Sequence, residues 1–321
     1  MKKIIALTLM LVMMLALCGV AHADFAPNGQ VSMIVAYKAG SHTDNSARVL
    51  AKYAEKYVGQ NIVIENVEGA DSVGWSQLAE ADPNGQTIGF INLPRFSTSI
   101  ADEMVTYNIE SFTPICNHIT ETFIIIVRAD DDRFPDLEAL VAFGKENEGT
   151  KTELLASTNG PKTYSHIGAQ AFANSACLMY SYISHGGTAD QLQSLRGKEA
   201  DFAVVKLTDI IGQEAEYRIL GAFADERLSE LPDVPTLGEL GYYEGWLGSS
   251  RCIVAPAGVS EDVVKFYEDA FKQAMEDPDY LEAAEQAGMA TDYKDAETTG
   301  ALILQQQEFA ESQAEGFWYD D

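Results

Sequence analysis

The chain has 321 residues, of which 49 are Asp or Glu and 21 are Lys or Arg, so its formal net charge at pH 7 is −28. So acidic a chain is not expected to bind nucleic acid, because phosphate contacts need a basic face. The acidity does not exclude a small anionic ligand, since one site can be positive within a negative protein. The length is sufficient for two α/β domains, each with a core of its own.

The first 23 residues have the pattern of a secretory signal peptide. Two lysines follow the initiator Met, residues 4–17 are apolar, and Ala-His-Ala at 21–23 fits a small-x-small cleavage site. The apolar segment is too short to span a bilayer comfortably. Lipoprotein processing at Cys18 is the alternative, but Leu17 stands where a small residue is expected. We therefore predict a periplasmic protein that begins at Asp24.

Three cysteines remain in the mature chain, Cys116, Cys177 and Cys252, and none of them forms a CxxC pair. At most one intramolecular disulfide can form, and we interpret all three as small buried residues. The sequence predicts no metal site and no other cofactor.

Residues 31–48 carry the most information. A β-branched apolar run at 31–35 meets a loop of small residues, and an amphipathic helix begins near Thr43 and Asp44. The first N–H groups of a helix have no intrahelical partner and lie at the positive end of its dipole, so this loop can bind an anion. Every βα unit has such a turn, and an ordinary connection is the alternative. The predicted ligand-binding residues are Ala39, Gly40, Ser41, His42 and Thr43.

A second strand at 63–66, a glycine-containing turn and a helix at 75–81 follow, and then a turn at 82–89 leads into a third strand. Ser72 is placed on the pocket wall. Asn92 and Arg95 come after the third strand, where Arg95 would bind a carboxylate in bidentate fashion or lie on the surface.

The rest of the chain alternates strands and helices in the same way. A dense apolar strand at 123–127 suits burial on both faces, residues 130–134 form a charged turn, and Asp136 caps a helix at 137–143. Further strands are predicted at 153–156, 179–183, 201–205 and 251–255, and further helices at 164–173, 189–195, 261–275, 279–287 and 297–313. Such βαβ alternation predicts mainly parallel sheets. Ligands bind beyond the carboxyl ends of such strands, which adds these candidates: Asn159, Gly160, Thr163, Ser165 and His185.

Several motifs together resemble one family. Tyr-Lys-Ala-Gly-Ser-His-Thr-Asp at 37–44, a Glu-Asn-x-x-Gly-Ala segment within 64–74, and Pro-Asn-Gly-Gln-Thr at 83–87 follow in order. His-Gly-Gly-Thr-Ala at 185–189, Leu-Pro-Asp-Val-Pro-Thr at 231–236 and Ala-Pro-Ala-Gly at 255–258 continue the series. This order is similar to that of the substrate-binding receptors of tripartite tricarboxylate transporters, the Bug family, over nearly the whole mature chain.

The resemblance implies an α/β, two-lobed periplasmic binding protein fold of type II, with a hinge and an interdomain cleft. Lobe 1 would comprise residues 24–127 and 252–321, and lobe 2 residues 128–251. In such receptors, two loops that face each other across the cleft hold a ligand carboxylate between helix N-termini. The corresponding loops of this chain are residues 39–43 and 157–165. The implied partners are a small organic acid (a di- or tricarboxylate or an aromatic carboxylate) and the membrane permease subunits of the transporter, with the receptor itself a monomer and not an enzyme. The sequence does not identify the acid.

Two other functions remain open at this point. One is a secreted hydrolase that uses Ser165 or Cys177 with His166 or His185, although the chain has no GxSxG or HExxH motif. The other is a solute receptor that signals to a sensor kinase, which the sequence does not distinguish from a transport receptor.

Overall fold

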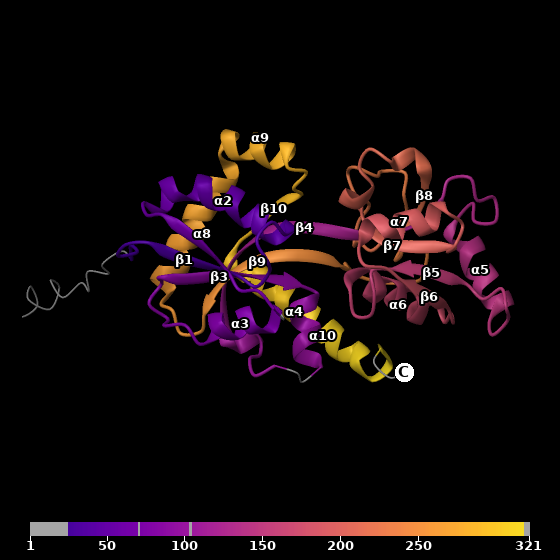
Figure 1. Cartoon of the computed structure of the whole chain (residues 1–321), viewed down its shortest axis with the longest axis horizontal. Helices are drawn as coiled ribbons and strands as arrows, with labels where there is room; N and C mark the ends of the chain where they lie inside the picture. The colour runs from indigo at the N-terminus through magenta and orange to yellow at the C-terminus, as the bar shows by residue number, and fades with distance from the viewer. Residues whose placement is uncertain (1–24, 70, 103–104, 318–321) are drawn as a thin grey trace, which may run out of the picture.

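Two lobes lie side by side along the long axis of the molecule (Figure 1). The computed structural model describes residues 25–69, 71–102 and 105–317. Two long strands, β4 (Phe112–Arg128) and β9 (Gly248–Pro256), run from one lobe into the other. The predicted two-lobed α/β architecture is therefore confirmed.

Lobe 1 is built on a mixed sheet in the order β2-β1-β3-β9-β4, with β10 paired to the other edge of β4. Its strands are β1 (Val31–Val35), β2 (Ile62–Asn66), β3 (Thr87–Leu93) and β10 (Thr291–Lys294). Its helices are α2 (His42–Val58), α3 (Asp71–Ala79), α4 (Arg95–Ala101), α8 (Glu261–Glu276), α9 (Pro278–Gln286) and α10 (Ala296–Phe317), with a short 3-10 turn η1 (Ile109–Ser111).

Lobe 2 continues from β4 in the order β4-β7-β5-β6, and β8 pairs with the other edge of β4. Its strands are β5 (Leu155–Thr158), β6 (Ser181–Ser184), β7 (Phe202–Lys206) and β8 (Tyr217–Ala222). Its helices are α5 (Leu137–Asn147), α6 (Tyr164–Ala176) and α7 (Thr188–Arg196), with 3-10 turns η2 (Leu207–Ile210) and η3 (Glu214–Glu216).

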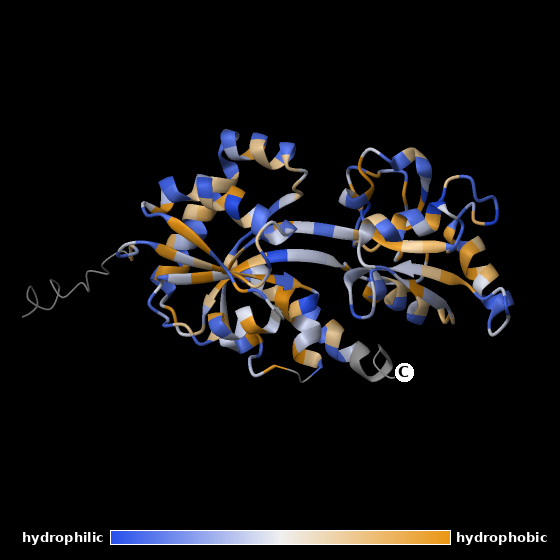
Figure 2. Ribbon diagram, viewed as in Figure 1, coloured by the Kyte–Doolittle hydropathy of each residue, from blue (hydrophilic) through white to orange (hydrophobic). Residues whose placement is uncertain are grey.

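The central strands of each sheet are buried on both faces, which explains the continuous apolar runs in β3, β7, β9 and the second half of β4. In β4, Phe123, Ile125 and Val127 enter one core of lobe 2, while Ile124 and Ile126 enter the other. Apolar residues concentrate in the strands within each lobe, whereas the stretches of β4 and β9 between the lobes are more polar (Figure 2). The polar segment at 117–122 therefore marks where β4 passes between the lobes.

The expectation of mainly parallel sheets was wrong. Among the pairs formed by the described strands, four are parallel and five are antiparallel. Every antiparallel pair includes β4 or β9, because these two strands pass between the lobes in opposite directions. The sequence prediction also missed α4, β8 and β10.

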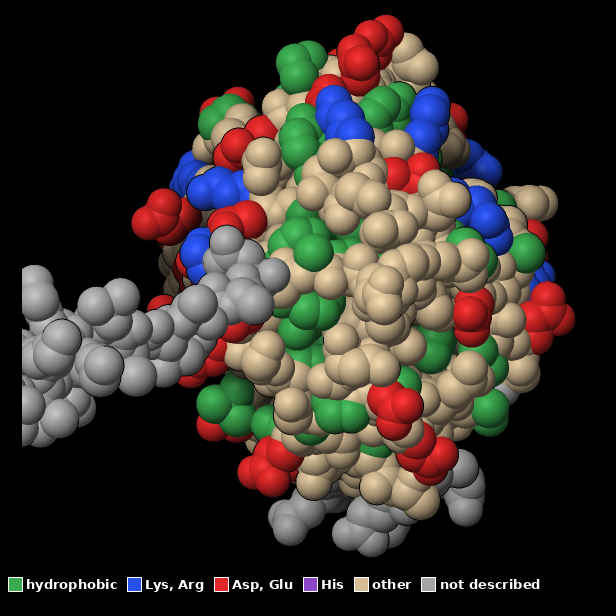
Figure 3. Space-filling view, turned by 90° about the vertical axis from the view of Figure 1, so that its left-hand side faces the viewer, with side chains coloured by type: hydrophobic (Ala, Val, Ile, Leu, Met, Phe, Trp, Pro, Cys, Tyr) green, Lys and Arg blue, Asp and Glu red, His purple; other side chains and the backbone are tan. Residues whose placement is uncertain are grey.

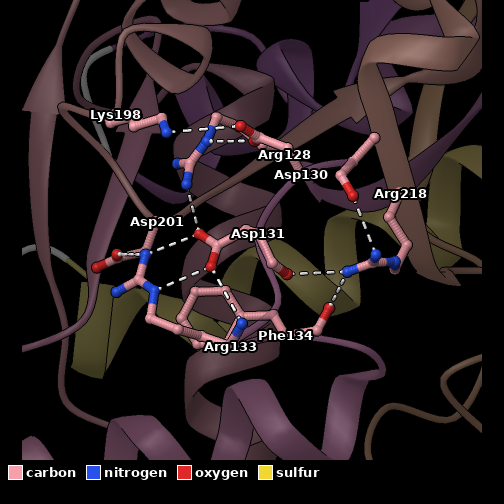
Figure 4. Close-up of polar contacts among 9 residues, drawn as sticks. Arg128, Asp130, Asp131, Arg133, Phe134, Lys198, Asp201 and Arg218 are labelled. Atoms are coloured by element: carbon pink, nitrogen blue, oxygen red, sulfur yellow. Dashed lines mark hydrogen bonds and ion pairs between the residues drawn. The ribbon is translucent and has the colours of Figure 1, made fainter.

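The charged turn after β4 is held by a compact ionic cluster (Figure 4). Asp131 is buried and accepts hydrogen bonds from Arg128 and Arg133, and Arg133 also contacts Asp201 at 2.8 Å. Arg218 of β8 donates to the carbonyl oxygens of Ala129, Asp131 and Phe134. The cluster thus fixes the start of lobe 2 directly after the crossing strand.

The prediction that all three cysteines are buried was wrong for one of them. Cys116 and Cys252 are buried, but Cys177, which ends α6 in the left-handed conformation, is exposed. All three are free thiols.

The predicted lobe boundaries at 127/128 and 251/252 fall within β4 and β9 and stay predictions. The signal peptide and Cys18 lie outside the described residues. Among the helices described, none has the length and apolar character needed to cross a membrane. On the end of lobe 1 shown in Figure 3, acidic side chains are dispersed over the face, with lysines and arginines among them.

Candidate functional site

A cavity of about 570 Å³ lies between the lobes. Lobe 1 contributes Tyr37 and the segment from Asn92 to Arg95, and lobe 2 contributes the N-terminus of α6 and the end of β7. The crossing strand β9 contributes Ser249, Ser250 and Arg251. The cavity is of the size that holds small-molecule ligands.

The charge of this cavity is opposite to that of the protein. Four basic side chains line it, Arg95, Lys162, Lys206 and Arg251, and no Asp or Glu is among the described residues that do so. Three of these cations pair with carboxylates that are not themselves in the lining. Lys162 pairs with Asp102 of the other lobe, and Lys206 and Arg251 pair with Glu121. Asp209 lies 3.9 Å from Lys206 Nζ. The cavity wall is therefore locally cationic in a chain of net charge −28.

The loop before α2 is held largely by its own hydrogen bonds. Ser41 caps α2 by accepting from the Asp44 amide at 3.2 Å, and Asp44 in turn accepts from the Gly40 amide at 2.8 Å. Arg48 and Asn66 also donate to the buried Asp44 carboxylate. Burial would raise the pKa of Asp44, but the hydrogen bonds from Arg48, Gly40 and Asn66 lower it. Asp44 thus places a fixed negative charge at this helix N-terminus.

Asn92 links this loop to the cavity. Its side-chain amide donates to Thr43 Oγ1 at 2.8 Å, and its Oδ1 is buried with no partner among the described residues. Arg95 begins α4 immediately after a cis Leu93–Pro94 peptide and lines the cavity. That it binds a carboxylate stays a prediction.

The opposite loop, before α6, also satisfies its own amides. The amides of Asn159 and Gly160 donate to Ser165 Oγ and Thr158 Oγ1, at 2.8 and 3.3 Å. Thr163 is the N-cap residue of α6, yet its hydroxyl donates to Gly160 O at 2.7 Å and does not cap the helix. The start of α6 therefore has no side-chain cap from Thr163, and Thr163 and Tyr164 line the cavity. An uncapped helix N-terminus of this kind can bind an anion.

Glu121 connects the two crossing strands at the inner wall. Its carboxylate contacts Lys206 Nζ at 3.1 Å and Arg251 Nη2 at 3.3 Å, and accepts from Thr208 Oγ1 at 2.6 Å. Burial would raise the pKa of Glu121, but Lys206 and Arg251 outweigh this effect and hold it below its usual range. Lys206 Nζ also lies 5.3 Å from the centre of the Tyr164 ring.

One ion pair joins the lobes across the cavity. Lys162, which follows the Gly160 turn with a φ of 60°, contacts both carboxylate oxygens of Asp102 at 2.9 Å. Asp102 ends α4 in lobe 1, so this pair spans the cleft.

The predicted ligand-binding residues fall into three groups, according to their position relative to the cavity. The cavity itself is lined by Asn92, Arg95 and Thr163. Residues Asn159, Gly160 and Ser165 support the α6 loop, and the His185 amide donates to Thr158 O beside them. Outside the lining are Ala39, Gly40, Ser41, His42, Thr43 and Ser72.

The sequence analysis missed Lys206, Ser249, Ser250 and Arg251. A lysine directly after the predicted strand at 201–205 was a usable signal, because ligands bind beyond the carboxyl ends of strands. The polar Gly-Ser-Ser-Arg run at 248–251 gave no comparable signal.

Two of the residues considered for a hydrolase, Ser165 and His166, make hydrogen bonds to the loop before α6. Ser165 Oγ accepts from the Asn159 amide at 2.8 Å, and His166 Nδ1 accepts from the Lys162 amide at 3.2 Å. Burial lowers the pKa of His166. Cys177 lies at the far, C-terminal end of α6.

Comparisons with known proteins bear out the resemblance in the sequence motifs. The family model described as "Tripartite tricarboxylate transporter family receptor" matches residues 46–313. A Cupriavidus necator protein, "UPF0065 protein in gbd 5'region", is 28% identical over 284 residues, 86% of this chain and 84% of its own length. A Polaromonas TctC solute-binding protein without ligand superposes with a TM-score of 0.83 at 21% identity, covering 91% of this chain and 99% of that one. MatC from Rhodopseudomonas palustris with bound malate gives 0.68 at 21% identity, covering 90% and 99%.

Proposed function

Since the chain belongs to the tripartite tricarboxylate transporter receptor family, we propose that it captures a small organic carboxylate and delivers it to a membrane permease. The observation that carries this proposal is the cavity between the lobes, lined by four basic side chains and, among its described residues, by no acidic one. The bound malate of the structurally similar MatC supports a carboxylate as the ligand class.

The geometry supports binding and release without a chemical step. The uncapped N-terminus of α6 offers backbone amides and a positive dipole end, and Lys162 and Arg95 lie at the same cavity. Because β4 and β9 connect the lobes, rotation about these strands would close both lobes on the ligand, as hinge proteins do.

The site of action follows from the same proposal. Export by the signal peptide at residues 1–23 would bring the receptor to the periplasm, where the permease subunits are accessible. The proposal includes the lobe boundaries predicted from the sequence. Lobe 1 (residues 24–127 and 252–321) and lobe 2 (residues 128–251) would be the two rigid bodies that close on the ligand.

Titration calorimetry of the mature chain tests the ligand class. In a panel of di- and tricarboxylates and aromatic acids, at least one acid should give a saturable binding isotherm. Mass spectrometry of native protein would identify an acid carried through purification. No binder in the panel and none in the native preparation would refute the proposal.

A matched pair of variants tests the role of α6. Thr163→Asp places a carboxylate at the N-cap facing the cavity, and Asp is itself a good N-cap residue, so the helix should keep its stability. Ser260→Asp makes the same change at the N-cap of α8 in lobe 1. Binding should be lost in Thr163→Asp and kept in Ser260→Asp, with similar melting temperatures. Equal binding by both variants would remove α6 from the site.

A further inference from the structure

A second cavity, of about 450 Å³, lies between the lobes on the other side of the crossing strands. One of its walls comes from lobe 1, at the end of α9 and residues 288–290, and the other from lobe 2, at η2, η3 and residues 228–231. In Figure 1, α9 and β10 lie above β4 and β9, whereas α4 and α6, which begin beside the first cavity, lie below them. We call this second cavity the rear groove. Its volume is in the range that holds small molecules.

Both walls of the rear groove are largely apolar. Met289 packs against a core of lobe 1. Three leucines of the opposite wall pack against a core of lobe 2, Leu207, Leu228 and Leu231. Ile211, on the same wall, is 61% exposed. An apolar group that enters the groove would therefore leave water and contact apolar side chains of both lobes, which is favourable.

The charge of the rear groove is opposite to that of the first cavity. Four glutamates line it, and no Lys, Arg or His is among the described residues that do so. Glu121 is paired with the cations of the first cavity. The other three, Glu214, Glu230 and Glu285, are exposed, and among the described residues no Lys or Arg lies within ion-pair distance of them. The rim of the groove therefore carries unbalanced negative charge, which favours a cation and opposes an anion.

We propose that the rear groove is a second binding site, for a small organic cation whose apolar chain ends in an ammonium group. The apolar walls would bury the chain, and the three exposed glutamates would bind the ammonium group. Since β4 and β9 pass between the two cavities, a rotation that narrows the first cavity widens the rear groove, so an occupant of the groove favours the closed lobes. This coupling rests on the proposed function, whereas the site itself does not.

Titration of the mature chain with hexylammonium, followed by two-dimensional NMR of the ¹⁵N-labelled protein, tests the site. Amide signals of residues 207–214, 228–231 and 285–290 should shift with saturation. Hexan-1-ol has the same chain without the charge and should bind the same residues about 3- to 10-fold more weakly, because exposed ion pairs contribute modestly. No shift in these segments, or equal affinity for the alcohol, would overturn the inference.

Two variants separate the charge of the rim from the apolar wall. The double variant Glu230→Gln/Glu285→Gln removes a carboxylate from each wall and should bring the affinity for hexylammonium close to that for hexan-1-ol. Ile211→Ser should weaken both probes. All three residues are exposed, so the fold should tolerate these changes. Glu146→Gln, at an exposed position of α5, is the control and should change neither affinity. A double variant that keeps the preference for the cation would overturn the inference.

The coupling is measured with the acid of the calorimetric panel that binds most tightly. Saturating hexylammonium should raise the affinity for this acid about fivefold, and by reciprocity the acid should raise the affinity for hexylammonium by the same factor. An unchanged or lowered affinity would overturn the coupling. A protein that binds hexylammonium in the rear groove but binds no carboxylate would refute the proposed function and leave the second site intact.

Discussion

Glu121 gives the most direct test of how this protein places cations at an internal wall. Glu121→Gln keeps the shape and one acceptor oxygen, but removes the charge that Lys206 and Arg251 share. Because the carboxylate is only 7% exposed, both cations are left buried with an amide that offers them N–H donors. Breaking a buried pair in this way costs about 3 kcal/mol, at the lower end of the usual range.

The cost should be visible in both thermal and chemical unfolding. For a chain of this size, about 3 kcal/mol corresponds to a fall in melting temperature of about 5 °C. Urea unfolding at pH 7.5 should show a lower midpoint with an unchanged m-value. Glu65→Gln is the control, because Glu65 is an exposed carboxylate on β2 of lobe 1.

The pH dependence gives an independent check. Lys206 and Arg251 hold the pKa of Glu121 below its unfolded value of about 4.3, so the folded state favours the charged form. The stability that Glu121 contributes is thus complete above about pH 4.3 and is lost as the pH falls through the folded pKa. The difference in stability between wild type and Glu121→Gln should therefore shrink as the pH falls below about 4.3. A difference under about 1 kcal/mol at pH 7.5, or one that stays constant as the pH falls below about 4.3, would refute this account.

Three other features lead to predictions. Burial lowers the pKa of His118 to about 3, so the wild type should lose stability as the pH falls below about 6.5. His118→Gln removes the titrating ring but keeps a side chain that can hydrogen-bond to the Tyr280 hydroxyl, so it should flatten the change in urea midpoint between pH 7 and 5. An equal change of the urea midpoint with pH in both proteins would contradict this explanation. Of the cysteines at 116, 177 and 252, a thiol reagent should label only Cys177 in the native protein, and labelling of either buried cysteine before unfolding would contradict the packing. Ser41→Ala removes the cap of α2 and should cost about 1 kcal/mol by urea unfolding, whereas Ser41→Asp should not; equal losses would mean that the hydroxyl does not act as a cap.

Elements with a strong apolar period could be predicted from the sequence, and weakly patterned ones could not. β10 has the sequence Thr-Asp-Tyr-Lys, and all four residues are half-buried. It therefore shows neither an apolar run nor an alternation of buried and exposed residues that would predict a strand. α4 has only seven residues, three of them Ser or Thr. The hydroxyls of Thr98 and Ser99 donate to Arg95 O, and such bonds to the backbone compete with helix formation, so these residues do not predict a helix.

The candidate site shows the same division. Arg95 comes shortly after the apolar strand β3, and Thr163 directly precedes helix α6. Both elements have a clear sequence pattern, so both residues could be placed at the cavity from the sequence. Lys206 and Arg251 are 45 positions apart, and both depend on Glu121, in the polar stretch where β4 passes between the lobes. Their approach depends on the strand register around β4, which local patterns do not encode.

The charge of the whole protein and the charge of its cavity act on a ligand at different distances. A net charge of −28 repels a dianion at long range, whereas the contacts with Lys206 and Arg251 act only after the ligand has entered. Salt screens the long-range repulsion, since the Debye length falls from about 30 Å at 0.01 M to about 8 Å at 0.15 M, and buried contacts are screened much less. The association rate of a dicarboxylate, measured by stopped-flow fluorescence, should therefore rise with ionic strength, and that of its monoamide should rise less. A rate that falls with salt would mean that the cationic wall already attracts the ligand from outside the cleft.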